Sequence, residues 1–434
     1  DGLTGKALAT TDYLPSRMPD DAGNLNPTSD QLRAVWGDGS GNRGDRFLAC
    51  VAYLDGVRPS VVMCRGYYTR TFLAAWDWRG GKLTQRWIFD SSDPKTPGNR
   101  AFAGQGNHNL SVADVDDDGK DEVIYGGCVI NDNGKGLFST GYGHGDAIHV
   151  GDLDPQNPGL EMFRIQESFG DAGAHMVALK TGQTLWKKPS LDRNASGGKG
   201  QGPGRGLAAD IDPRYPGAES WALGAGVTGN WDARGQQIAE NAPRLSLLPG
   251  QITYGFDTPD TQSRLAPTCN FRIYWDGDLL DELLDGSQIV KWNWEKEATT
   301  PLLVAEGCTS VNGTKANPAL SADILGDWRE EVIFPTSDGK ELRIFTTTIP
   351  TQHRLYTLMH DPVYRLAIAW QNTGYNQPPH AGFSIGPERK PVLRPKITTT
   401  PAKRPLSSAQ AAAQRLLERR RPAYENNEGG TTSP

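Results

Sequence analysis

Short apolar runs alternate with polar turns along most of the chain, and the spacing of an amphipathic helix is scarce. Typical runs are RFLACVAYL from Arg46, EVIYGGCVI from Glu122 and ELRIFTTT from Glu341. The runs are rich in β-branched or aromatic residues and are bounded by Gly, Pro, Asn or Asp, which favour turns. The pattern therefore predicts an all-β protein built from many short strands.

A degenerate repeat links these strands. Its fullest copies are VADVDDDGKDEVIY, VGDLDPQNPGLEMF, AADIDPRYPGAESWAL and SADILGDWREEVIF, and weaker copies surround Asp55 and Asp276. Each copy reads as a strand, an acidic turn and a second strand, and from Asp55 to Asp323 the copies recur about every 54 residues. Four short strands in roughly 40–50 residues are typical of a β-propeller blade, and insertions lengthen the period. A β-propeller is therefore predicted.

Two segments depart from the repeat. The polar stretch 227–268 is predicted to be a surface insertion or an extra hairpin. Residues 391–434 are predicted to be a Thr/Pro/Ser linker, a short helix at AAAQRLLERRR and a disordered end. The catalytic domain is thus expected over residues 1–390. The opening DGLTGKALATT resembles a turn between two strands and not a signal peptide, so we expect a longer protein whose N-terminal part precedes it.

Charge and cysteine content narrow the class of protein. The net charge is −6, but residues 391–434 carry eight basic and three acidic side chains, which leaves −11 on the rest. This balance argues against a nucleic-acid binder and suits a protein that holds cations. The sequence contains no run of about 18 apolar residues, so no membrane span is predicted. Five cysteines show no zinc spacing, and either a Cys50–Cys64 pair or free thiols fit them.

The acidic turn DVDDDGKDE has the composition of a calcium loop. Asp114, Asp116 and Asp118 alternate, Gly119 permits a sharp bend, and Glu122 follows. Ca²⁺ takes about six to eight oxygen ligands, which such a turn can gather. The alternative is a solvated Asp/Gly turn.

Three further turns offer fewer carboxylates. They contain Asp152, Asp154 and Glu161; Asp210, Asp212 and Glu219; and Asp323, Asp327 and Glu331. Each turn fits either a structural calcium ion or aspartates that cap backbone amides. If calcium is bound, a chelator should lower the melting temperature, because an ion bound by the folded state alone stabilises it.

Histidines and acids lie in the loops that a propeller would bring to one face. His108 precedes the first acidic turn, His144 and Asp146 precede the second, and Glu167 follows it. Such a set could hold a cation, and two imidazoles suit Zn²⁺ or Mn²⁺ better than Ca²⁺. Separate hydrogen-bonded loop histidines are the alternative. The other five histidines are interpreted as structural: His149, His175, His353, His360 and His380.

Several longer motifs resemble one known family. They include DRFLACVAYLDGVRPSVVMCRGYYTRT, GHGDAIHVGDLDPQNPGLE, GRGLAADIDPRYPGAE, NGTKANPALSADILGDWREEVI and LMHDPVYRLAIAWQNTGYNQPPHAGFSIG. In this order they resemble the rhamnogalacturonan lyases of polysaccharide lyase family 11 over about residues 1–387. The resemblance implies a secreted, monomeric, eight-bladed β-propeller that binds several calcium ions and cleaves rhamnogalacturonan I of pectin by β-elimination. The family's N-terminal β-sandwich and first blades are expected to precede this chain.

The resemblance also implies roles for residues in the matching motifs. Asn312, Gly313, Thr314 and Tyr375 match residues at the rhamnose subsite, and Lys315 and Arg205 match the two basic residues at the galacturonate. His108, His144, Asp146 and Glu167 match ligands of a calcium ion in the cleft, despite the imidazoles.

β-Elimination removes the weakly acidic C5 proton beside the uronate carboxylate. The carboxylate charge must be neutralised, which a cation or the planar fork of Arg205 can do. Lys315 can act as the base only if its pKa falls well below about 10.4. Alternatively, Lys315 holds the carboxylate while Arg205 or another group takes the proton, or Lys315 is a bystander. Arg205 in turn could form a structural ion pair with the adjacent acidic turn.

Two other functions remain as hypotheses. A calcium propeller can bind carbohydrate without cleaving it. ALKTGQTLWK, from Ala178, has the strand-turn pattern of quinone-dependent dehydrogenases, with no further motif of that class. A lyase leaves a conjugated double bond that absorbs in the ultraviolet, whereas a hydrolase leaves reducing ends alone.

Overall fold

The structure is a computed structural model that describes residues 1–37, 39, 44–191, 202–246, 265–312, 315–375 and 377–386. The side chains of residues 245, 246 and 265–267 are not described. The chain divides into two compact units, Asp1–Val392 and Leu393–Pro434, and every described residue lies in the first. The tail predicted over residues 391–434 and residues 247–264 of the predicted insertion therefore lie outside the described residues.

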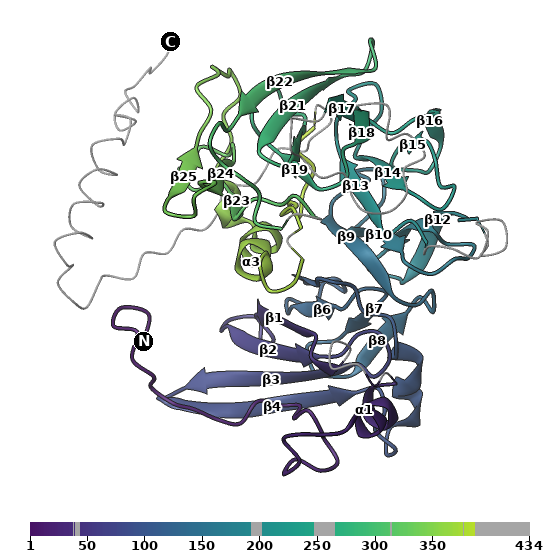
Figure 1. The fold of residues 1–434 in the computed structure, drawn as a ribbon, viewed down its shortest axis with the longest axis vertical. Coiled ribbons are helices and arrows are strands. Elements are labelled where there is room, and N and C mark those ends of the chain that lie inside the picture. Colours follow the sequence, from purple (N-terminus) through teal and green to yellow (C-terminus); the bar gives the residue numbers. More distant parts are fainter. Residues whose placement is uncertain are drawn as a thin grey trace, which may run out of the picture. The chain divides into compact units, whose positions relative to one another are not determined.

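The described residues form antiparallel sheets whose strands follow one another in the sequence (Figure 1). The first sheet holds β1 (Phe47–Ala52), β2 (Ser60–Arg65), β3 (Phe72–Arg79) and β4 (Lys82–Asp90). The second holds β5 (Ser111–Ala113), β6 (Glu122–Ile124), β7 (Cys128–Ile130) and β8 (Gly136–Ser139). The third holds β9 (Gly145–Gly151), β10 (Glu161–Gln166), β11 (Ala174–Ala178) and β12 (Gln183–Lys188).

The remaining sheets continue this order. The fourth holds β13 (Arg205–Ala209), β14 (Glu219–Leu223), β15 (Asn230–Trp231) and β16 (Gln237–Ala239), and a hairpin of β17 (Arg244–Ser246) and β18 (Leu265–Pro267) follows. The next sheet holds β19 (Phe271–Ile273), β20 (Glu282–Asp285), β21 (Gln288–Asn293) and β22 (Ala298–Val304). The last holds β23 (Leu320–Ala322), β24 (Glu331–Pro335) and β25 (Leu342–Phe345). Within the predicted insertion, residues 230–239 thus complete a regular sheet and β17–β18 form an extra hairpin.

The first strands of the sheets are more buried than the last. Every residue of β9 and β13 is buried, whereas β12 and β22 contain only exposed and half-buried positions, and β4 has one buried residue, Phe89, among such positions. Separate hydrophobic clusters pack between consecutive sheets, for example Phe163 and Met176 against Ala208 and Trp231. The prediction of an all-β protein is confirmed, although no sheet in the described ranges closes on itself.

Among the described residues, two α-helices interrupt the β pattern, and the sequence analysis predicted neither of them. They are α1 (Ser29–Trp36) and α3 (Pro362–Trp370), both labelled in Figure 1. Helix α3 contacts β1, β5 and β23. Short 3₁₀ turns, η1 (Pro97–Phe102) and η2 (Leu358–His360), complete the described structure. None of the helices in the described ranges is both long and apolar enough to cross a membrane.

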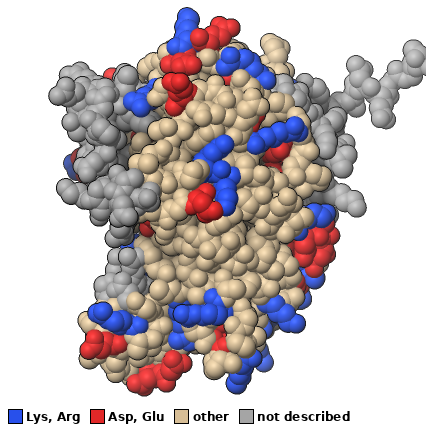
Figure 2. Space-filling view, turned by 90° about the vertical axis from the view of Figure 1, so that its right-hand side faces the viewer, with Lys and Arg blue, Asp and Glu red and all other residues tan. Residues whose placement is uncertain are grey.

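Two predictions on composition can be compared with the structure. All five cysteines are free thiols, so the Cys50–Cys64 pair that the sequence left open is not formed. On the face drawn in Figure 2, basic and acidic side chains lie interspersed and are not gathered into a field of one sign.

Candidate active site

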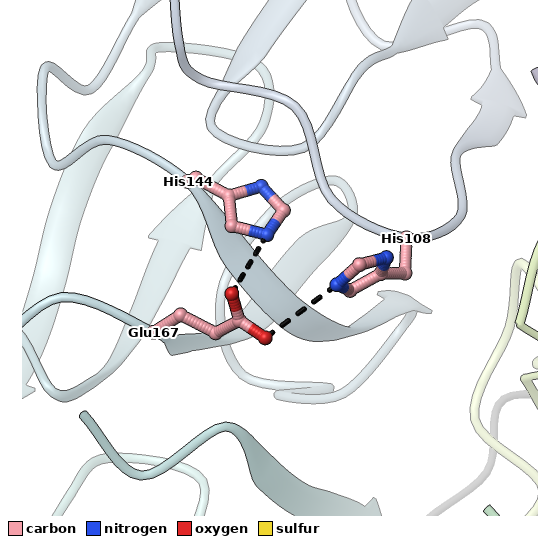
Figure 3. Close-up of side chains that lie close together, drawn as sticks. All are labelled: His108, His144 and Glu167. Atoms are coloured by element: carbon pink, nitrogen blue, oxygen red, sulfur yellow. Dashed lines mark ion pairs between the residues drawn. The ribbon is translucent and has the colours of Figure 1, made fainter. Parts of the chain in front are cut away.

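Two histidines and a glutamate from three loops converge at one point (Figure 3). His108 lies before β5, His144 lies before β9, and Glu167 follows β10. Because β9 and β10 are antiparallel, with Gly145 opposite Gln166, the start of one strand meets the end of the other. His144 Nε2 is 3.0 Å from Glu167 Oε2, and His108 Nε2 is 3.5 Å from Glu167 Oε1.

The outer ring nitrogens of both histidines have partners. His144 Nδ1 lies 2.6 Å from the carbonyl oxygen of Gly106, which can only accept, so Nδ1 carries the proton. The Nε2 of His144 then faces the Glu167 carboxylate with its lone pair, and it is buried without a hydrogen bond of acceptable geometry. His108 Nδ1 lies 2.9 Å from the hydroxyl of Tyr67. A lone pair and a carboxylate aimed at one point fit a cation held between them.

The charge state of Glu167 agrees with this arrangement. Burial alone would raise its pKa, but the imidazoles of His108 and His144 beside the carboxylate outweigh burial and hold the pKa of Glu167 well below its usual range. The carboxylate is therefore ionised and available as a ligand.

Arg205 and Lys315 meet at a single carboxylate next to this cluster. Arg205 Nη1 is 2.9 Å from Asp146 Oδ2, and Lys315 Nζ contacts the same oxygen. All three side chains are buried, with 4–6% of each residue exposed. Burial raises the pKa of Asp146, against the opposing charges of His108 and Arg205. The other oxygen of Asp146 is 3.9 Å from His108 Nε2, so the basic pair and the His/His/Glu cluster form one site.

Tyr375 forms an aromatic wall of this site. Its ring stacks on His108 with centroids 4.2 Å apart, and Lys315 Nζ lies 4.2 Å from the centroid of the Tyr375 ring. Asn109 donates to the carbonyl oxygen of Tyr375 at 3.0 Å, which ties its loop to that of His108. The predicted rhamnose residue Tyr375 and the predicted galacturonate residue Lys315 are thus adjacent.

The turn that carries Lys315 is closed by Asn312. The backbone amide of Lys315 donates to the Asn312 side chain at 3.2 Å, and that of Ala316 donates to the Asn312 carbonyl at 2.6 Å. Ala316 has a φ of 50°, the left-handed conformation that a tight turn requires. Gly313 and Thr314, which were predicted to contact rhamnose, lie outside the described residues.

Arg164 holds together two loops of the site, and the sequence analysis did not identify it. Its guanidinium is fully buried and donates to Asn107 Oδ1 at 2.6 Å, to the Gln105 carbonyl at 2.9 Å and to the Gly143 carbonyl. Burial lowers the pKa of Arg164 to about 9. The side chain therefore joins the loop of His108 to the loop of His144, and its only sequence signal is a basic residue inside the apolar strand EMFRIQ.

The acidic turns share one backbone design. The glutamate that begins the second strand of a sheet accepts hydrogen bonds from the turn before it through Oε2. Glu219 Oε2, for example, accepts from the amides of Ile211 and Asp212 at 2.9 Å each. Some aspartates also cap amides, as the alternative hypothesis held: Asp114 accepts from Gly119 at 3.0 Å.

The turns differ in how far they gather carboxylates. Ligand atoms of Asp114, Asp116 and Glu122 lie within 4.8 Å of one another, and Glu122 Oε1 is buried without a hydrogen bond. Burial raises the pKa of Glu122 to about 8, and the charges of Asp116 and Asp114 add to this effect. Asp118 does not join them, because it pairs with Lys120 at 2.7 Å. The first turn therefore fits a cation, held by three of its four predicted ligands.

The other three predicted turns do not form comparable clusters among the described residues. Their aspartates meet other groups, as Asp152 with the Ser384 amide, Asp154 with Arg234, Asp212 with Arg214, Asp323 with the Leu358 amide and Asp327 with Arg329. Glu219 nevertheless keeps a buried Oε1 without a hydrogen bond, and burial together with the charges of Asp210 and Asp212 raises its pKa well above the usual value. Glu161 Oε1 instead accepts from Asn157 at 2.6 Å.

Comparisons with known proteins agree on one family. The model of "Rhamnogalacturonan lyase family 11, C-terminal domain" matches residues 1–395. Rhamnogalacturonan endolyase YesW of Bacillus subtilis (strain 168) is 48% identical over 406 residues, which cover 92% of this chain and 56% of that protein. Rhamnogalacturonan exolyase YesX of the same strain is 47% identical over 417 residues, which cover 91% of this chain and 59% of that protein.

Solved structures lead to the same group. The rhamnogalacturonan lyase of Bacillus licheniformis superposes with a TM-score of 0.77 at 51% identity, over 91% of this chain and 59% of that one. The crystal structure of YesW superposes with a TM-score of 0.77 at 49% identity, over 92% of this chain and 60% of that one. The chain therefore spans less than two thirds of the length of these relatives.

Proposed function

The chain belongs to rhamnogalacturonan lyase family 11, and on that premise we propose that it cleaves rhamnogalacturonan I of pectin by β-elimination. The observation that carries the proposal is the convergence of Arg205 and Lys315 on Asp146, beside His108 and Tyr375. Lys315 of this buried basic pair lies against the Tyr375 ring, and this combination suits a sugar that carries a carboxylate. The substrate is a polysaccharide or oligosaccharide met outside the cell, and the protein acts as a monomer.

The proposed fold is an eight-bladed β-propeller of which this chain forms the later blades. Three features of the described sheets support it: their order along the chain, their buried first strands and the clusters packed between consecutive sheets. The curated relatives are longer than this chain, and their additional residues would supply the remaining blades. Residues 1–390 then form the catalytic domain and residues 391–434 a linker and tail.

Calcium ions are the proposed cofactors. His108, His144 and Glu167 would hold one ion in the site, and Asp114, Asp116 and Glu122 another in the first acidic turn. The buried, unbonded oxygen of Glu219 supports a further ion in its turn. An ion in the site would contribute positive charge near the substrate carboxylate.

In the proposed mechanism the uronate carboxylate takes the place of Asp146 between Arg205 and Lys315. Arg205 matches a carboxylate with two parallel N–H donors, and it neutralises the charge that grows as the C5–H bond breaks. Lys315 acts as the base in its neutral form, and the amine takes the C5 proton. The electron pair of the C5–H bond forms the C4–C5 double bond, and the C4–O bond breaks as the glycosidic oxygen leaves and takes up a proton from water. The product is an unsaturated uronate.

The test is ultraviolet absorbance during incubation with rhamnogalacturonan I. The absorbance should rise when the parent chain is present. The rate of this rise should be at least about a hundredfold lower with Arg205→Ala, because an electrostatic contact of the transition state is lost. With Lys315→Ala the absorbance should not rise. Lys187→Ala is the matched control, because Lys187 is an exposed lysine on β12 that forms an ion pair with Asp171 and contacts none of the site residues named above. New reducing ends without absorbance would identify a hydrolase and overturn the proposal.

A carbohydrate-binding protein without activity is the second candidate. The chain covers only 56–60% of its relatives, so a substrate-binding surface could be complete while the catalytic one is not. Retention of rhamnogalacturonan I by the parent chain, without absorbance or reducing ends, would favour this function.

A further inference from the structure

A fifth acidic turn, around Asp276, has the same backbone design as the others. Glu282 begins β20, and its Oε2 accepts from the amides of Trp275 at 2.7 Å and Asp276 at 3.0 Å. Ligand atoms of Asp276, Asp278 and Glu282 lie within 4.8 Å of one another, as they do in the turn of Asp114. The arrangement of its three carboxylates is therefore the one expected of a cation site.

A lysine occupies the centre of this turn. Lys291 Nζ lies 2.6 Å from Glu282 Oε1, 2.7 Å from Asp278 Oδ2 and 3.3 Å from Asp276 Oδ2. An ammonium group has three N–H donors, so each of the three carboxylates can receive one. Glu282 is fully buried, and the side chain of Lys291 is only 18% exposed. The second oxygen of Glu282 is thus neutralised, whereas the same oxygen of Glu122 and Glu219 is buried without a hydrogen bond.

The strand register explains why this turn alone has an internal cation. Leu283 pairs with Val290, which brings Lys291 on β21 beside Glu282. The pairing in the other sheets places a different residue beside each glutamate: Asn131 for Glu122, Ala178 for Glu161, Asp232 for Glu219 and Thr346 for Glu331. Of these five equivalent positions, only that of Lys291 carries a positive charge.

Other basic residues near the acidic turns do not reach this position. Lys120 pairs with Asp118 and Asp132 from the surface, with 38% of its side chain exposed. Arg214 pairs with Asp212, with 54% of its side chain exposed. Neither forms an ion pair with the buried glutamate of its turn, so the Oε1 atoms of Glu122 and Glu219 stay without a hydrogen bond.

We propose that the ammonium group of Lys291 replaces a divalent cation in the turn of Asp276, Asp278 and Glu282, so that this turn folds without a bound metal ion. Burial by itself lowers the pKa of Lys291, but the charges of Glu282 and Asp278 outweigh it and raise the pKa above its ordinary value. The lysine is therefore charged at neutral pH. A bound calcium ion at the same point would meet this positive charge at contact distance.

Calcium binding to chelator-treated protein tests the proposal by calorimetric titration. Lys291→Met removes the charge and keeps a side chain of similar length, and it should bind one more calcium ion per chain than the parent. The double variant Lys291→Met/Asp278→Asn should lose the added ion. Lys187→Met, which removes an exposed lysine paired with one aspartate, should bind as many ions as the parent. Because each result is a difference from the parent, it does not depend on how many ions the parent binds or on lyase activity.

An unchanged stoichiometry in folded Lys291→Met would overturn the proposal. A second measurement uses the parent alone and does not require the variant to fold. Acetylation of lysines, followed by peptide mass spectrometry, should modify Lys291 far less than Lys340, whose side chain is 80% exposed. Excess calcium should leave the modification of Lys291 unchanged. A calcium-dependent increase would mean that the ion displaces the lysine, which contradicts the proposal.

Discussion

At the scale of single residues, each histidine of the site is held on the side that faces away from Glu167. The Tyr67 hydroxyl lies 2.9 Å from His108 Nδ1, and the Gly106 carbonyl lies 2.6 Å from His144 Nδ1. Such partners fix the tautomer and the ring orientation of a metal-binding imidazole. Only 2% of Tyr67 is exposed, so water does not readily replace its hydroxyl.

Tyr67→Phe should therefore weaken cation binding at the site without unfolding the protein. Loss of an outer partner of a histidine ligand costs roughly tenfold or more in metal affinity. Terbium luminescence titration measures the change. Tyr13→Phe is the control, because it also loses a hydroxyl hydrogen bond, to the Cys64 carbonyl at 2.6 Å, away from the histidines. Equal losses of affinity in both variants would show that Tyr67 has no specific role.

Motifs in the sequence identified residues that come together at the candidate site, but not the residues that hold them there. Lys315 and Arg205 lie in distinctive motifs, and the family resemblance implied that both lie at the galacturonate. Their contacts with Asp146, which the resemblance made a calcium ligand, were not predicted. Arg164 and Tyr67 carry no such signal. Their roles depend on which loops the sheets bring together, and Asp146 and Lys315 meet across 169 residues of sequence.

At the scale of elements, α3 is the piece that fastens the last described sheet to the first two. It contacts β1, β5 and β23, and the Tyr364 hydroxyl lies 2.7 Å from Glu330. Asp361 caps the helix by accepting from the Tyr364 amide at 3.1 Å, and it also accepts from the Gly382 amide at 2.7 Å.

Asp361→Ala should lower the free energy of unfolding by about 2 kcal/mol, because it removes a cap and leaves two amides without partners. Thr28→Ala at the exposed start of α1 is the matched control, and it should cost about 1 kcal/mol or less. Denaturant unfolding measures both. A smaller loss for Asp361→Ala than for Thr28→Ala would contradict the fastening role of α3.

The sequence predicted strands better than helices for a physical reason. A unit of strand, acidic turn and second strand, with a glutamate that accepts hydrogen bonds from the turn, occurs five times. Each copy therefore supports the interpretation of the others as strands. The two helices have eight and nine residues and occur once each. Their start signals were present, as the capping box from Thr28 to Gln31 and the pair Asp361–Pro362. Two to three helical turns were too short to stand out from the surrounding β pattern.

At the scale of the whole molecule, the proposed calcium ions would act as clamps between strands. Removal of calcium leaves buried carboxylates such as Glu122 and Glu219 close to other acids. An ion present at a hundredfold excess over its Kd stabilises a folded protein by about 2.7 kcal/mol. A chelator should therefore lower the melting temperature by several degrees, and added calcium should restore it.

Glu122→Gln links this effect to one turn. The variant keeps the size of the side chain but loses a ligand charge, so its melting temperature should depend less on calcium than that of the parent. Scanning calorimetry with and without a chelator measures the difference. Asp338→Asn, at an exposed turn between β24 and β25, is the control. A melting temperature of the parent that a chelator does not change would rule out structural calcium in this chain.

Buried histidines should make stability fall in mild acid. Burial lowers the pKa of His175 to about 3 and that of His149 to about 4, against an ordinary value of 6.5. Between these values and pH 6.5 the unfolded chain binds more protons than the folded one, so the free energy of unfolding rises with pH. The contribution of each histidine is complete above pH 6.5 and is lost as the pH falls, by about 1.4 kcal/mol per pH unit.

His175→Phe removes one of these groups. His175 Nδ1 donates to the Ala172 carbonyl at 3.0 Å, so the variant should be less stable than the parent near pH 7. Its stability should nevertheless fall less steeply between pH 6 and pH 4.5, by about 1.4 kcal/mol per pH unit, because the unfolded state no longer gains that proton. Urea unfolding across this range measures the slope. Parallel pH profiles of His175→Phe and the parent would contradict this account, because they would mean that the buried imidazole takes up its proton as readily in the folded chain as in the unfolded one.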